Sequence, residues 1–476
     1  MDLGERIEAT ARTAADTATV LVRTGLLHPE PPGRFLRAAR ASHRWGRTPG
    51  GVVAANAIRH GDRPCLIDDA GAVSHVELHD RTNRLANALA GLGLGPGDGI
   101  GLLCRDHRHF VEALVATSKL GGDLLLLNTA FSGPQLRDVV AREGAAALVH
   151  DAEFADLVGD VDPSVQRIVG LTEDGAASGH TVEELIAGAP AREPDPPPQA
   201  GRQILLTSGT TGTPKGAQRP RDTSLAVILG YLSRVPLKRR EHLLIASPMF
   251  HAWGFAHLGL GLLLGAEITV RRRFDPEGTL AAIDANGVTA LAIVPVMAQR
   301  IMQLEPAVRR RYDTSSLRLA VFGGSAIPGD LAVHFMDEFG DVVHNVYGST
   351  EVAVATVAAP DDLREDPQTA GHVLPGVVVK LLDEHDREVP HGDVGRIFVG
   401  GEASFEGYTD GTGKAVADGL MSSGDVGRFD PAGRLAIEGR DDDMIVSGGE
   451  NVFPREVEDV IVGLDQVVEA AVIGVD

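Results

Sequence analysis

The strongest constraint on the fold is an alternation of two hydrophobic patterns that starts at about residue 50. Helical periodicity, as in RTNRLANALAGLG (81–93), alternates with the short apolar runs GIGLLC (99–104), DLLLLN (123–128) and AALVHD (146–151). Apolar residues three or four positions apart favour a helix, and short apolar runs favour buried strands. The alternation therefore predicts parallel strands joined by crossover helices, in a layered α/β body.

Other segments predict how this body is divided and extended. A chain of 476 residues is too long for one core, so we expect at least two domains. The proline-rich stretch AREPDPPPQA (191–200) predicts an extended linker. Residues 377–401 and 427–440 have the pattern of hairpins, with turns at DEHD and DPAG.

Charge and cysteine content exclude some kinds of partner. The net charge of -22 argues against nucleic acid, because a phosphate backbone needs a clustered positive field. An anionic ligand must therefore be held by a local site. Cys65 and Cys104 are the only cysteines, so we expect no disulfide framework or cysteine metal site, and we place the chain in a reducing cytoplasm.

The N-terminal region is helical in pattern, over residues 4–27 and again over 34–47. The second segment, RFLRAARASHRWGR, spaces its arginines three or four residues apart on one face, near Phe35, Leu36 and Trp45. A basic helix of this kind could lie on an anionic membrane, as a peripheral contact at its inner face. The alternative, which the pattern favours, is a solvated basic face whose apolar side packs on the main body.

The stretch TSGTTGTPKG (207–216) combines three glycines and four threonines with one of the five lysines of the chain, Lys215. Backbone N–H groups freed by glycine, threonine hydroxyls and a lysine charge can together bind phosphate oxygens. The pattern is not a Walker loop, which needs glycine before the lysine and Ser or Thr after it. The alternative is a polar hairpin turn.

Two further segments carry groups that suit a nucleotide. In VYGSTE (346–351), Tyr347 offers a flat face for a purine, Thr350 a hydroxyl for a phosphate and Glu351 a carboxylate for Mg²⁺. In VFGGSAIP (321–328), two glycines would let the backbone approach a base. Taken alone, VYGSTE is more often a turn after a strand, and VFGGSAIP fits a turn at the end of a strand equally well.

Three more residues are candidates of the same kind. Asp425, in SSGDVG, could accept both hydroxyls of a ribose, although an Asx-turn is the alternative. Arg440 could bond ribose or phosphate. His251 lies among aromatic residues in PMFHAWGF, where a lone histidine is more often a satisfied core residue.

Five segments occur together in an order and spacing that resembles the adenylate-forming superfamily of acyl-CoA synthetases, NRPS adenylation domains and luciferases. They are TSGTTGTPKG, SPMFHAWGF (247–255), VYGSTE, SSGDVGRFD (422–430) and GRDDDMIVSGGENVFPREVE (439–458). The resemblance covers roughly residues 50–476. Within the superfamily, the chain looks most like bacterial medium- to long-chain fatty acyl-CoA synthetases.

The resemblance implies a domain plan. An N-terminal helical segment (1–48) would precede a large AMP-binding adenylation domain (49–440), in which sheets are flanked by helices and joined by a small β-rich subdomain. Residues 441–476 would form a hinge and the beginning of a smaller α+β C-terminal domain.

The resemblance also implies roles for individual residues. The catalytic residues would be Lys215, His251, Thr350 and Glu351, with Glu351 as the Mg²⁺ ligand. Asp442 would be the hinge on which the C-terminal domain rotates, and Trp253 would lie near the acyl pocket. ATP or CoA would be bound by Thr207, Ser208, Gly209, Thr210, Thr211, Gly212, Lys215, Gly323, Gly324, Ser325, Tyr347, Gly348, Thr350, Asp425, Arg440, Gly448 and Gly449.

The implied activity is that of an AMP-forming fatty acid:CoA ligase. Its cofactors and co-substrates would be ATP, Mg²⁺ and CoA, and its intermediate an acyl-adenylate. An amino-acid-activating domain is disfavoured, because MFHAWGF offers no aspartate for a substrate amino group. A fatty acyl-AMP ligase that loads a carrier protein and a catalytically impaired nucleotide- or lipid-binding relative stay open, as does a homodimer.

The sequence stops at Asp476, one expected helix and one expected strand into the C-terminal domain, so the resemblance implies that this domain is truncated. Members of the superfamily continue to a lysine that reaches the active site during adenylation, whereas Lys414 is the last lysine here and lies before the hinge. Losing one pre-organised charged donor costs about 10²–10³ in rate. We therefore expect this chain to bind ATP and acyl-adenylate but to form acyl-CoA very poorly.

Overall fold

A computed structural model describes most of the chain, and its residues group into two compact units. The described residues are 17–172, 179–207, 214–218, 225–328, 330–401, 407–441, 445–447 and 450–452, with a few residues between 457 and 473. Unit 1 comprises Met1–Thr223, Lys238–Asp275 and Phe405–Thr412, and unit 2 comprises Ser224–Leu237, Pro276–Ser404 and Gly413–Asp476. The domain boundaries expected at residues 48 and 440 stay predictions. Among the described residues, no helix is long and apolar enough to cross a membrane.

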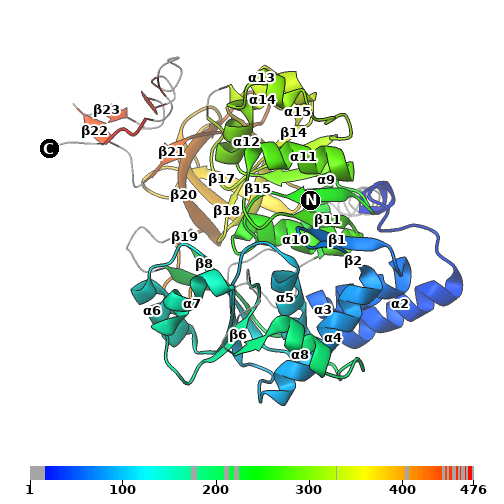
Figure 1. The fold of residues 1–476 in the computed structure, drawn as a ribbon. Coiled ribbons are helices and arrows are strands. Elements are labelled where there is room, and N and C mark those ends of the chain that lie inside the picture. The colour runs from blue at the N-terminus through cyan, green and yellow to red at the C-terminus, as the bar shows by residue number, and fades with distance from the viewer. Residues whose placement is uncertain are drawn as a thin grey trace, which may run out of the picture. The chain divides into compact units, whose positions relative to one another are not determined.

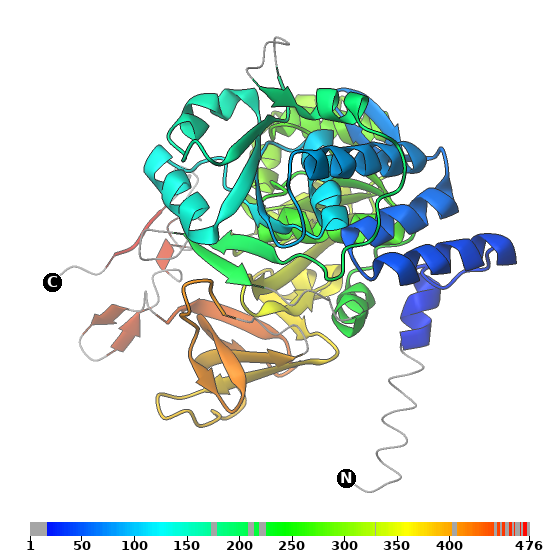
Figure 2. The ribbon, with the colours of Figure 1, turned by 90° about the horizontal axis from the view of Figure 1, so that it is seen from below.

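The N-terminal part of unit 1 is helical, as its pattern predicts. Residues 17–23 are helical, and the rest of the helix expected over 4–27 lies largely outside the described residues. Helix α2 (Pro32–Trp45) matches the second prediction, and it buries Ala38 and Trp45. Helix α3 (Pro49–His60) follows, and its first turn is capped by Thr48, whose hydroxyl accepts the N–H of Gly51 at 3.1 Å. Figures 1 and 2 show α2 and α3 beside each other.

The proline-rich linker 191–200 has no regular secondary structure, as expected. It is held against unit 1 by side chains of the helical region. Nε1 of Trp45 donates to Glu193 at 2.7 Å, and Nδ2 of Asn87 donates to the carbonyls of Pro190 and Arg192, each at 2.9 Å. The linker is therefore extended but fixed.

The larger sheet of unit 1 confirms the prediction of parallel strands with crossover helices. Its order is β7-β6-β5-β3-β4-β8-β9, and only the pair β8–β9 is antiparallel. Strand β3 is buried along its whole length, and Leu102 lies opposite Leu126 on one side and Val149 on the other. The strands are β3 (Gly99–Leu103), β4 (Asp123–Leu126), β5 (Ala145–His150), β6 (Gln166–Val169), β7 (His180–Thr181), β8 (Gln203–Thr207) and β9 (Lys215–Gln218).

A second group of strands in unit 1 has the order β10-β11-β1-β2. These strands are β1 (Pro64–Asp68), β2 (Gly71–Ser74), β10 (His242–Ile245) and β11 (Glu267–Val270). The remaining helices of unit 1 are α4 (His75–Gly91), α5 (Arg108–Leu120), α6 (Gly133–Glu143), η1 (Ala152–Phe154), α7 (Ala155–Gly159), α8 (Val182–Gly188) and α10 (Ala252–Leu264).

Unit 2 has a parallel part and an antiparallel part in one strand order, β17-β18-β20-β21-β16-β15-β14-β13-β12. Strands β12, β13 and β14 are parallel, and the later pairs are antiparallel. The strands are β12 (Ala290–Ile293), β13 (Leu319–Phe322), β14 (Val343–Ser349), β15 (Ala353–Ala358), β16 (Thr369–Val373), β17 (Val377–Leu382), β18 (Gly395–Gly401), β19 (Val416–Ala417), β20 (Leu420–Phe429) and β21 (Leu435–Arg440). The helices are α9 (Leu225–Arg234), α11 (Pro276–Asn286), α12 (Pro295–Met302), α13 (Pro306–Arg309), α14 (Leu331–Phe339) and α15 (Pro360–Glu365).

The hairpins expected near the C-terminus are present. Strands β17 and β18 form one, and its turn is closed by the N–H of Asp386 on the carbonyl of Asp383 at 3.1 Å. Strands β20 and β21 form the other, around the turn Asp430–Gly433. Beyond them lies a short hairpin, β22 (Ile445–Ser447) and β23 (Glu450–Val452). The strand expected over 467–476 is wrong for its described residues 470–473, which have no regular secondary structure.

Candidate active site

The best-defined polar group of the predicted site is the carboxylate of Asp425, in unit 2. Asp425 and Arg440 are opposite each other on β20 and β21. The hydroxyl of Tyr347, on β14, donates to Oδ2 of Asp425 at 2.6 Å, and Nη1 of Arg440 lies 3.5 Å from Oδ1. Burial and the neighbouring carboxylate raise the pKa of Tyr347 well above its usual value, so its hydroxyl stays a donor. The structure thus brings Tyr347, Asp425 and Arg440 together, although 78 residues separate the first two.

A second cation lies near Gly424, the residue that precedes Asp425. A Cβ added at Gly424 would lie 3.2 Å from Nη2 of Arg440 and 3.5 Å from Nζ of Lys414. The glycine, at φ +85°, therefore leaves the space in which the two cationic groups approach each other. This local positive charge can hold an anion in a chain whose net charge is -22. The position of Lys414 before the expected hinge does not indicate this approach, because the approach depends on the path of residues 413–424.

The glycines of VFGGSAIP lie at the carboxyl edge of the parallel strands. Phe322, the last residue of β13, is opposite Asn345 on β14, so Gly323 and Gly324 follow at the level of Tyr347. Gly324 has φ +86°, and Ser325 after it is exposed. Ligands of open α/β sheets bind at this edge, which suits the predicted contact with a base.

The turn between β14 and β15 holds Gly348, Thr350 and Glu351. A Cβ at Gly348 would collide with the carbonyl oxygen of Ala353, so only glycine fits this turn. The hydroxyl of Ser349 donates to Oε2 of Glu351 at 2.8 Å and accepts the N–H of Glu351 at 3.2 Å. The carboxylate of Glu351 therefore has a fixed position, and Thr350 lies beside it in the same turn.

Glu351 fits the predicted Mg²⁺ ligand by its chemistry. Mg²⁺ in nucleotide sites is usually held by one or two carboxylates, with water and phosphate oxygens completing the shell. Glu351 is partly exposed and oriented by Ser349, so its carboxylate can meet this need.

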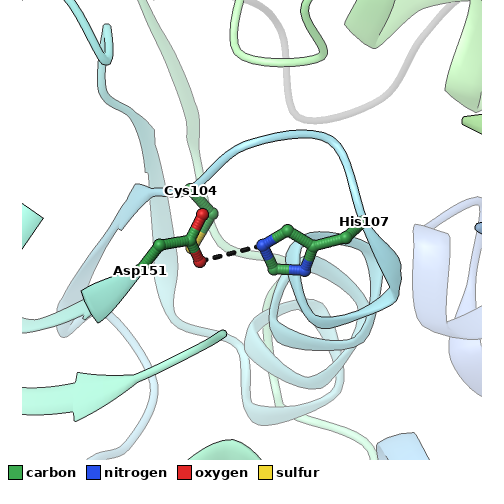
Figure 3. Close-up of side chains that lie close together, drawn as sticks. All are labelled: Cys104, His107 and Asp151. Atoms are coloured by element: carbon green, nitrogen blue, oxygen red, sulfur yellow. Dashed lines mark hydrogen bonds and ion pairs between the residues drawn. The ribbon is translucent and has the colours of Figure 1, made fainter. Parts of the chain in front are cut away.

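A different cluster, in unit 1, has the composition of a metal site (Figure 3). Ligand atoms of Cys104, His107 and Asp151 lie within 4.8 Å of one another and are buried. Nε2 of His107 bonds Oδ1 of Asp151 at 2.8 Å, and Nδ1 of His107 accepts the N–H of His109 at 3.2 Å. The other carboxylate oxygen accepts the N–H of Arg105 at 2.8 Å.

The thiol of Cys104 completes this network with a bond to the carbonyl of Val149 at 3.4 Å. Burial raises the pKa of Cys104, so the thiol stays protonated. Every group in the cluster is therefore satisfied by protein atoms. We interpret the cluster as a brace between the ends of β3 and β5 and the start of α5.

The glycine-rich stretch connects two antiparallel strands. Thr207 ends β8 and Lys215 begins β9, and the two are paired across the ladder. Ser208, Gly209, Thr210, Thr211 and Gly212 lie outside the described residues. The stretch therefore connects the two strands of a hairpin, which is the topology of the polar hairpin turn given as the alternative. Binding of phosphate by this loop stays a prediction.

Lys215 contacts a segment that the sequence did not point to, residues 408–412. Its Nζ donates to Oγ1 of Thr412 at 3.0 Å, lies 3.4 Å from Oδ2 of Asp410 and lies 5.3 Å from the ring centroid of Tyr408. A Cβ at Gly216 would lie 2.7 Å from Oγ1 of Thr409, so glycine is needed for this segment to pass. These contacts hold the lysine charge in place at the end of the loop.

His251 precedes α10, in the segment that SPMFHAWGF predicts. Its side chain is exposed, and its ring lies 4.4 Å from that of Phe250. Neighbouring protein atoms exclude solvent on part of the ring, which lowers its pKa. His251 is therefore not a buried core histidine, which was the alternative to a functional role. His257 has the features of such a core residue. His257 is buried, its pKa is lowered to about 4 by desolvation, and its Nδ1 bonds the carbonyl of Trp253 at 2.9 Å.

A buried carboxylate anchors this aromatic segment, and the sequence analysis missed it. Oδ1 of Asp106 accepts the N–H of Met249 at 2.9 Å, across 143 residues. Burial raises the pKa of Asp106 to about 7. Asp106 lies three residues after the end of β3, and an acidic residue just beyond the carboxyl end of a central strand is the one signal that could have found it.

The remaining predicted residues, Asp442, Gly448 and Gly449, lie outside the described residues. Lys215 and His251 belong to unit 1, and Tyr347, Glu351, Asp425 and Arg440 belong to unit 2. Each unit thus carries its own part of the predicted site.

Comparison with known proteins adds three kinds of finding. The profile of the AMP-binding enzyme family matches residues 53–409. A methyl-dioxo-octahydroindenyl propanoyl:CoA ligase of Rhodococcus jostii is 32% identical, covering 87% of this chain and 83% of the relative. A medium/long-chain-fatty-acid–CoA ligase of Mycobacterium tuberculosis is 31% identical, covering 87% and 75%. A fatty acid–(acyl-carrier-protein) ligase of Streptomyces coeruleorubidus is 30% identical, covering 86% and 80%.

Solved structures share the fold. The o-succinylbenzoate CoA synthetase of Bacillus subtilis, in complex with its acyl-adenylate intermediate, superposes with a TM-score of 0.77 at 26% identity, covering 89% of this chain and 85% of the other. An anthranilate CoA ligase in complex with anthranoyl-AMP has a TM-score of 0.82 at 23% identity, covering 90% and 85%. The α/β fold with a large sheet flanked by helices is confirmed by both.

Proposed function

Because this chain belongs to the AMP-binding enzyme family, in which it resembles the adenylate-forming acyl-CoA ligases, we propose that it joins a hydrophobic carboxylic acid to CoA through an acyl-adenylate. The observation that carries this proposal is the carboxylate of Asp425, held by Tyr347 and Arg440 within one unit. A fixed carboxylate with a neighbouring cation suits the ribose of a nucleotide.

In the first half-reaction, a substrate carboxylate oxygen attacks the α-phosphorus of ATP. A bond forms between this oxygen and phosphorus, and the bond from phosphorus to the bridging oxygen breaks, so pyrophosphate leaves. Positioning and stabilisation of phosphate charge carry such a step. Lys215 would offset charge on the phosphates, and Asp425 would fix the ribose hydroxyls.

Mg²⁺, when bound, would offset the charge of the phosphates. Glu351 would hold it, with Ser349 keeping the carboxylate in place. We expect Glu351→Gln to shift the Mg²⁺ dependence of the reaction to higher concentration, because the amide keeps the shape but lacks the charge. An unchanged Mg²⁺ titration would remove Glu351 from the site.

In the second half-reaction, the thiol of CoA attacks the carbonyl carbon of the acyl-adenylate. A carbon–sulfur bond forms, the bond to the AMP oxygen breaks, and the thiol proton is released. His251 is exposed, and its pKa is lowered. A neutral imidazole at neutral pH could accept that proton.

The acid is best described as a monocarboxylate with a large apolar body. The names of the relatives include a ring-bearing propanoate and medium- and long-chain fatty acids. The segment SPMFHAWGF places Phe250, Trp253 and Phe255 near His251 and has no acidic residue to bind a substrate amino group. We propose a medium- or long-chain fatty acid as the first candidate, with ring-bearing acids as the second.

A carrier protein is the second candidate for the acceptor. The relative from Streptomyces coeruleorubidus, named as a ligase for an acyl-carrier protein, favours it. The segment GGENVFPREVE favours CoA as the acceptor, because its sequence resembles that of acyl-CoA synthetases. We place the reaction in the cytoplasm, which the two free cysteines support.

The experiment is a panel of acids from acetate to palmitate, together with ferulate and an indenyl propanoate. Acid-dependent AMP release would be measured with CoA and, separately, with a phosphopantetheinylated carrier protein. Whatever the absolute rate, turnover among the acids should rise with their apolar surface, and the thioester that forms should be that of CoA. Thioester formation with the carrier protein alone would favour the second candidate, and activity limited to acetate would contradict the apolar substrate class.

A further inference from the structure

Helix α2 exposes large apolar side chains instead of burying them. Phe35 is 52% exposed and Leu36 is 54% exposed, whereas Ala38 and Trp45 are 0% and 4% exposed. The packing that the sequence favoured therefore applies to Ala38 and Trp45. Phe35 and Leu36, which are neighbours in the chain, together leave a small apolar surface of α2 open to solvent.

Arginines surround these two side chains. Arg34, Arg37 and Arg40 are exposed, and none of them forms an ion pair with a carboxylate in the part of the chain that the structure describes. Leu36 and Arg40 are four residues apart, so they are neighbours on the helix surface. Only the last turn of α2 is neutralised, because Arg44 lies 3.6 Å from Glu193 and 3.4 Å from Asp195.

More positive charge gathers at the N-terminal end of α2. Arg63 and Arg240 are exposed there, and partial desolvation, followed by like-charge repulsion from Arg63 and Arg34, lowers the pKa of Arg240. Glu30 in this region is already paired with Arg59 at 3.5 Å and Arg239 at 3.8 Å, whereas Asp62 and Glu241 directly adjoin Arg63 and Arg240 in the chain. We call Arg34, Arg37, Arg40, Arg63 and Arg240 the basic surface.

We propose that the basic surface docks unit 1 on an anionic lipid bilayer, with Phe35 and Leu36 inserted among the headgroups. Guanidinium groups bind lipid phosphates, and apolar side chains at the same level enter the acyl boundary. The chain as a whole has a net charge of -22, but beyond a Debye length of about 10 Å that charge is screened. A local basic surface can therefore bind an anionic membrane on an acidic protein.

The combination of arginines with exposed apolar side chains identifies a bilayer as the partner of the basic surface. Arginines alone would suit any polyanion. Exposed Phe35 and Leu36 between them need an apolar environment within a few ångströms of the phosphates, which a bilayer provides and a nucleic acid backbone does not. The acids proposed as substrates partition into bilayers, so docking would bring the enzyme to its substrate, but the proposal does not depend on that function.

The test is sedimentation of the full-length chain with vesicles of phosphatidylglycerol and phosphatidylcholine, against vesicles of phosphatidylcholine alone. We expect binding to the anionic vesicles at low salt and release at high salt. Each arginine near an anionic surface contributes about 1 kcal/mol, so Arg37→Ser/Arg40→Ser should lower the partition coefficient about 30-fold. Phe35→Ser/Leu36→Ser should lower it about tenfold.

A control variant places one change of each kind, one at an arginine and one at an apolar residue, elsewhere on the surface. Arg310→Ser/Val416→Ser removes one exposed arginine and one valine that is 64% exposed, far from α2 in sequence. This variant should bind like the unaltered chain, and all variants should keep their melting temperatures. Equal binding to both kinds of vesicle, no binding to either, or equal losses in the control would overturn the proposal. The proposal would also be contradicted if the arginine variant lost binding to anionic vesicles while the Phe35→Ser/Leu36→Ser variant kept it. The surface would then bind any polyanion and would not need a bilayer.

Discussion

The hydroxyl of Tyr347 is the smallest group on which the proposed nucleotide site depends. It donates to Asp425 at 2.6 Å, and hydrogen bonds to charged groups contribute about 1.5–3 kcal/mol. Tyr347→Phe keeps the ring and removes only this bond. The KM for ATP should therefore rise about tenfold.

A matched control exists elsewhere in unit 2. Tyr312 donates its hydroxyl to Glu277 at 2.8 Å, outside the predicted site. Tyr312→Phe removes a similar bond and should leave the KM for ATP unchanged. Equal effects of the two substitutions would show that Tyr347 acts only on stability.

Asp106 makes the stability of the fold depend on pH. Burial raises its pKa to about 7, whereas an unfolded aspartate titrates near 3.9. Between about pH 4 and pH 7 the folded chain keeps a proton that the unfolded chain releases, so the contribution of this group falls as pH rises and is constant above pH 7. Asp106→Asn keeps the acceptor for Met249 and does not titrate.

We therefore expect Asp106→Asn to gain stability relative to the unaltered chain between pH 5 and pH 8, by up to about 4 kcal/mol. Urea unfolding at several pH values measures the difference. Buried His75 and His257, with pKa values lowered to about 4, destabilise both proteins equally on the acid side. If the stabilities of Asp106→Asn and the unaltered chain changed with pH in parallel, Asp106 would not be buried and protonated. Asp156→Asn, at an exposed position, is the control, and its stability difference from the unaltered chain should not change with pH.

At the scale of elements, the turn between β14 and β15 places Glu351. Because a Cβ at Gly348 would collide with the backbone of Ala353, Gly348→Ala must open this turn and displace Glu351. We expect a loss of about 1–3 kcal/mol in stability together with a higher Mg²⁺ requirement. Gly91, in the last turn of α4, has open space at its Cβ position, so Gly91→Ala should be neutral or slightly stabilising. An unchanged Mg²⁺ requirement in Gly348→Ala would show that this turn does not position a ligand for Mg²⁺.

Elements of this kind could be predicted from the sequence where the signal is local. The apolar runs at 99–104, 123–128 and 146–151 became β3, β4 and β5, and the turn residues at DEHD and DPAG became the predicted hairpins. The exposure of Phe35 could not be predicted, because the helical pattern does not say which face finds a partner. The burial of Ala38 and Trp45 decides which face of α2 packs on unit 1. The burial of Trp45 depends in turn on its contact with the linker at 191–200.

At the scale of the whole chain, the candidate site is a set of long-range contacts. Sequence motifs located Tyr347, Asp425 and Arg440, but the bond between Tyr347 and Asp425 joins residues 78 apart. The contacts of Lys215 with Thr412 and of Met249 with Asp106 span 197 and 143 residues. No periodicity or spacing encodes such pairs, since they follow from the path of the folded chain, and so Asp106, Asp410 and Lys414 were missed.

The proposed function requires this chain to make an acyl-adenylate from ATP and a hydrophobic acid. Acid-dependent exchange of labelled pyrophosphate into ATP tests it most directly, because the exchange reports the first half-reaction alone. We predict exchange with medium- or long-chain acids, lowered about 10²–10³-fold in Lys215→Ala, whose side chain is partly exposed and whose loss should leave the melting temperature nearly unchanged. Absence of exchange with every acid in a chain that still binds ATP, or full exchange in Lys215→Ala, would contradict the account.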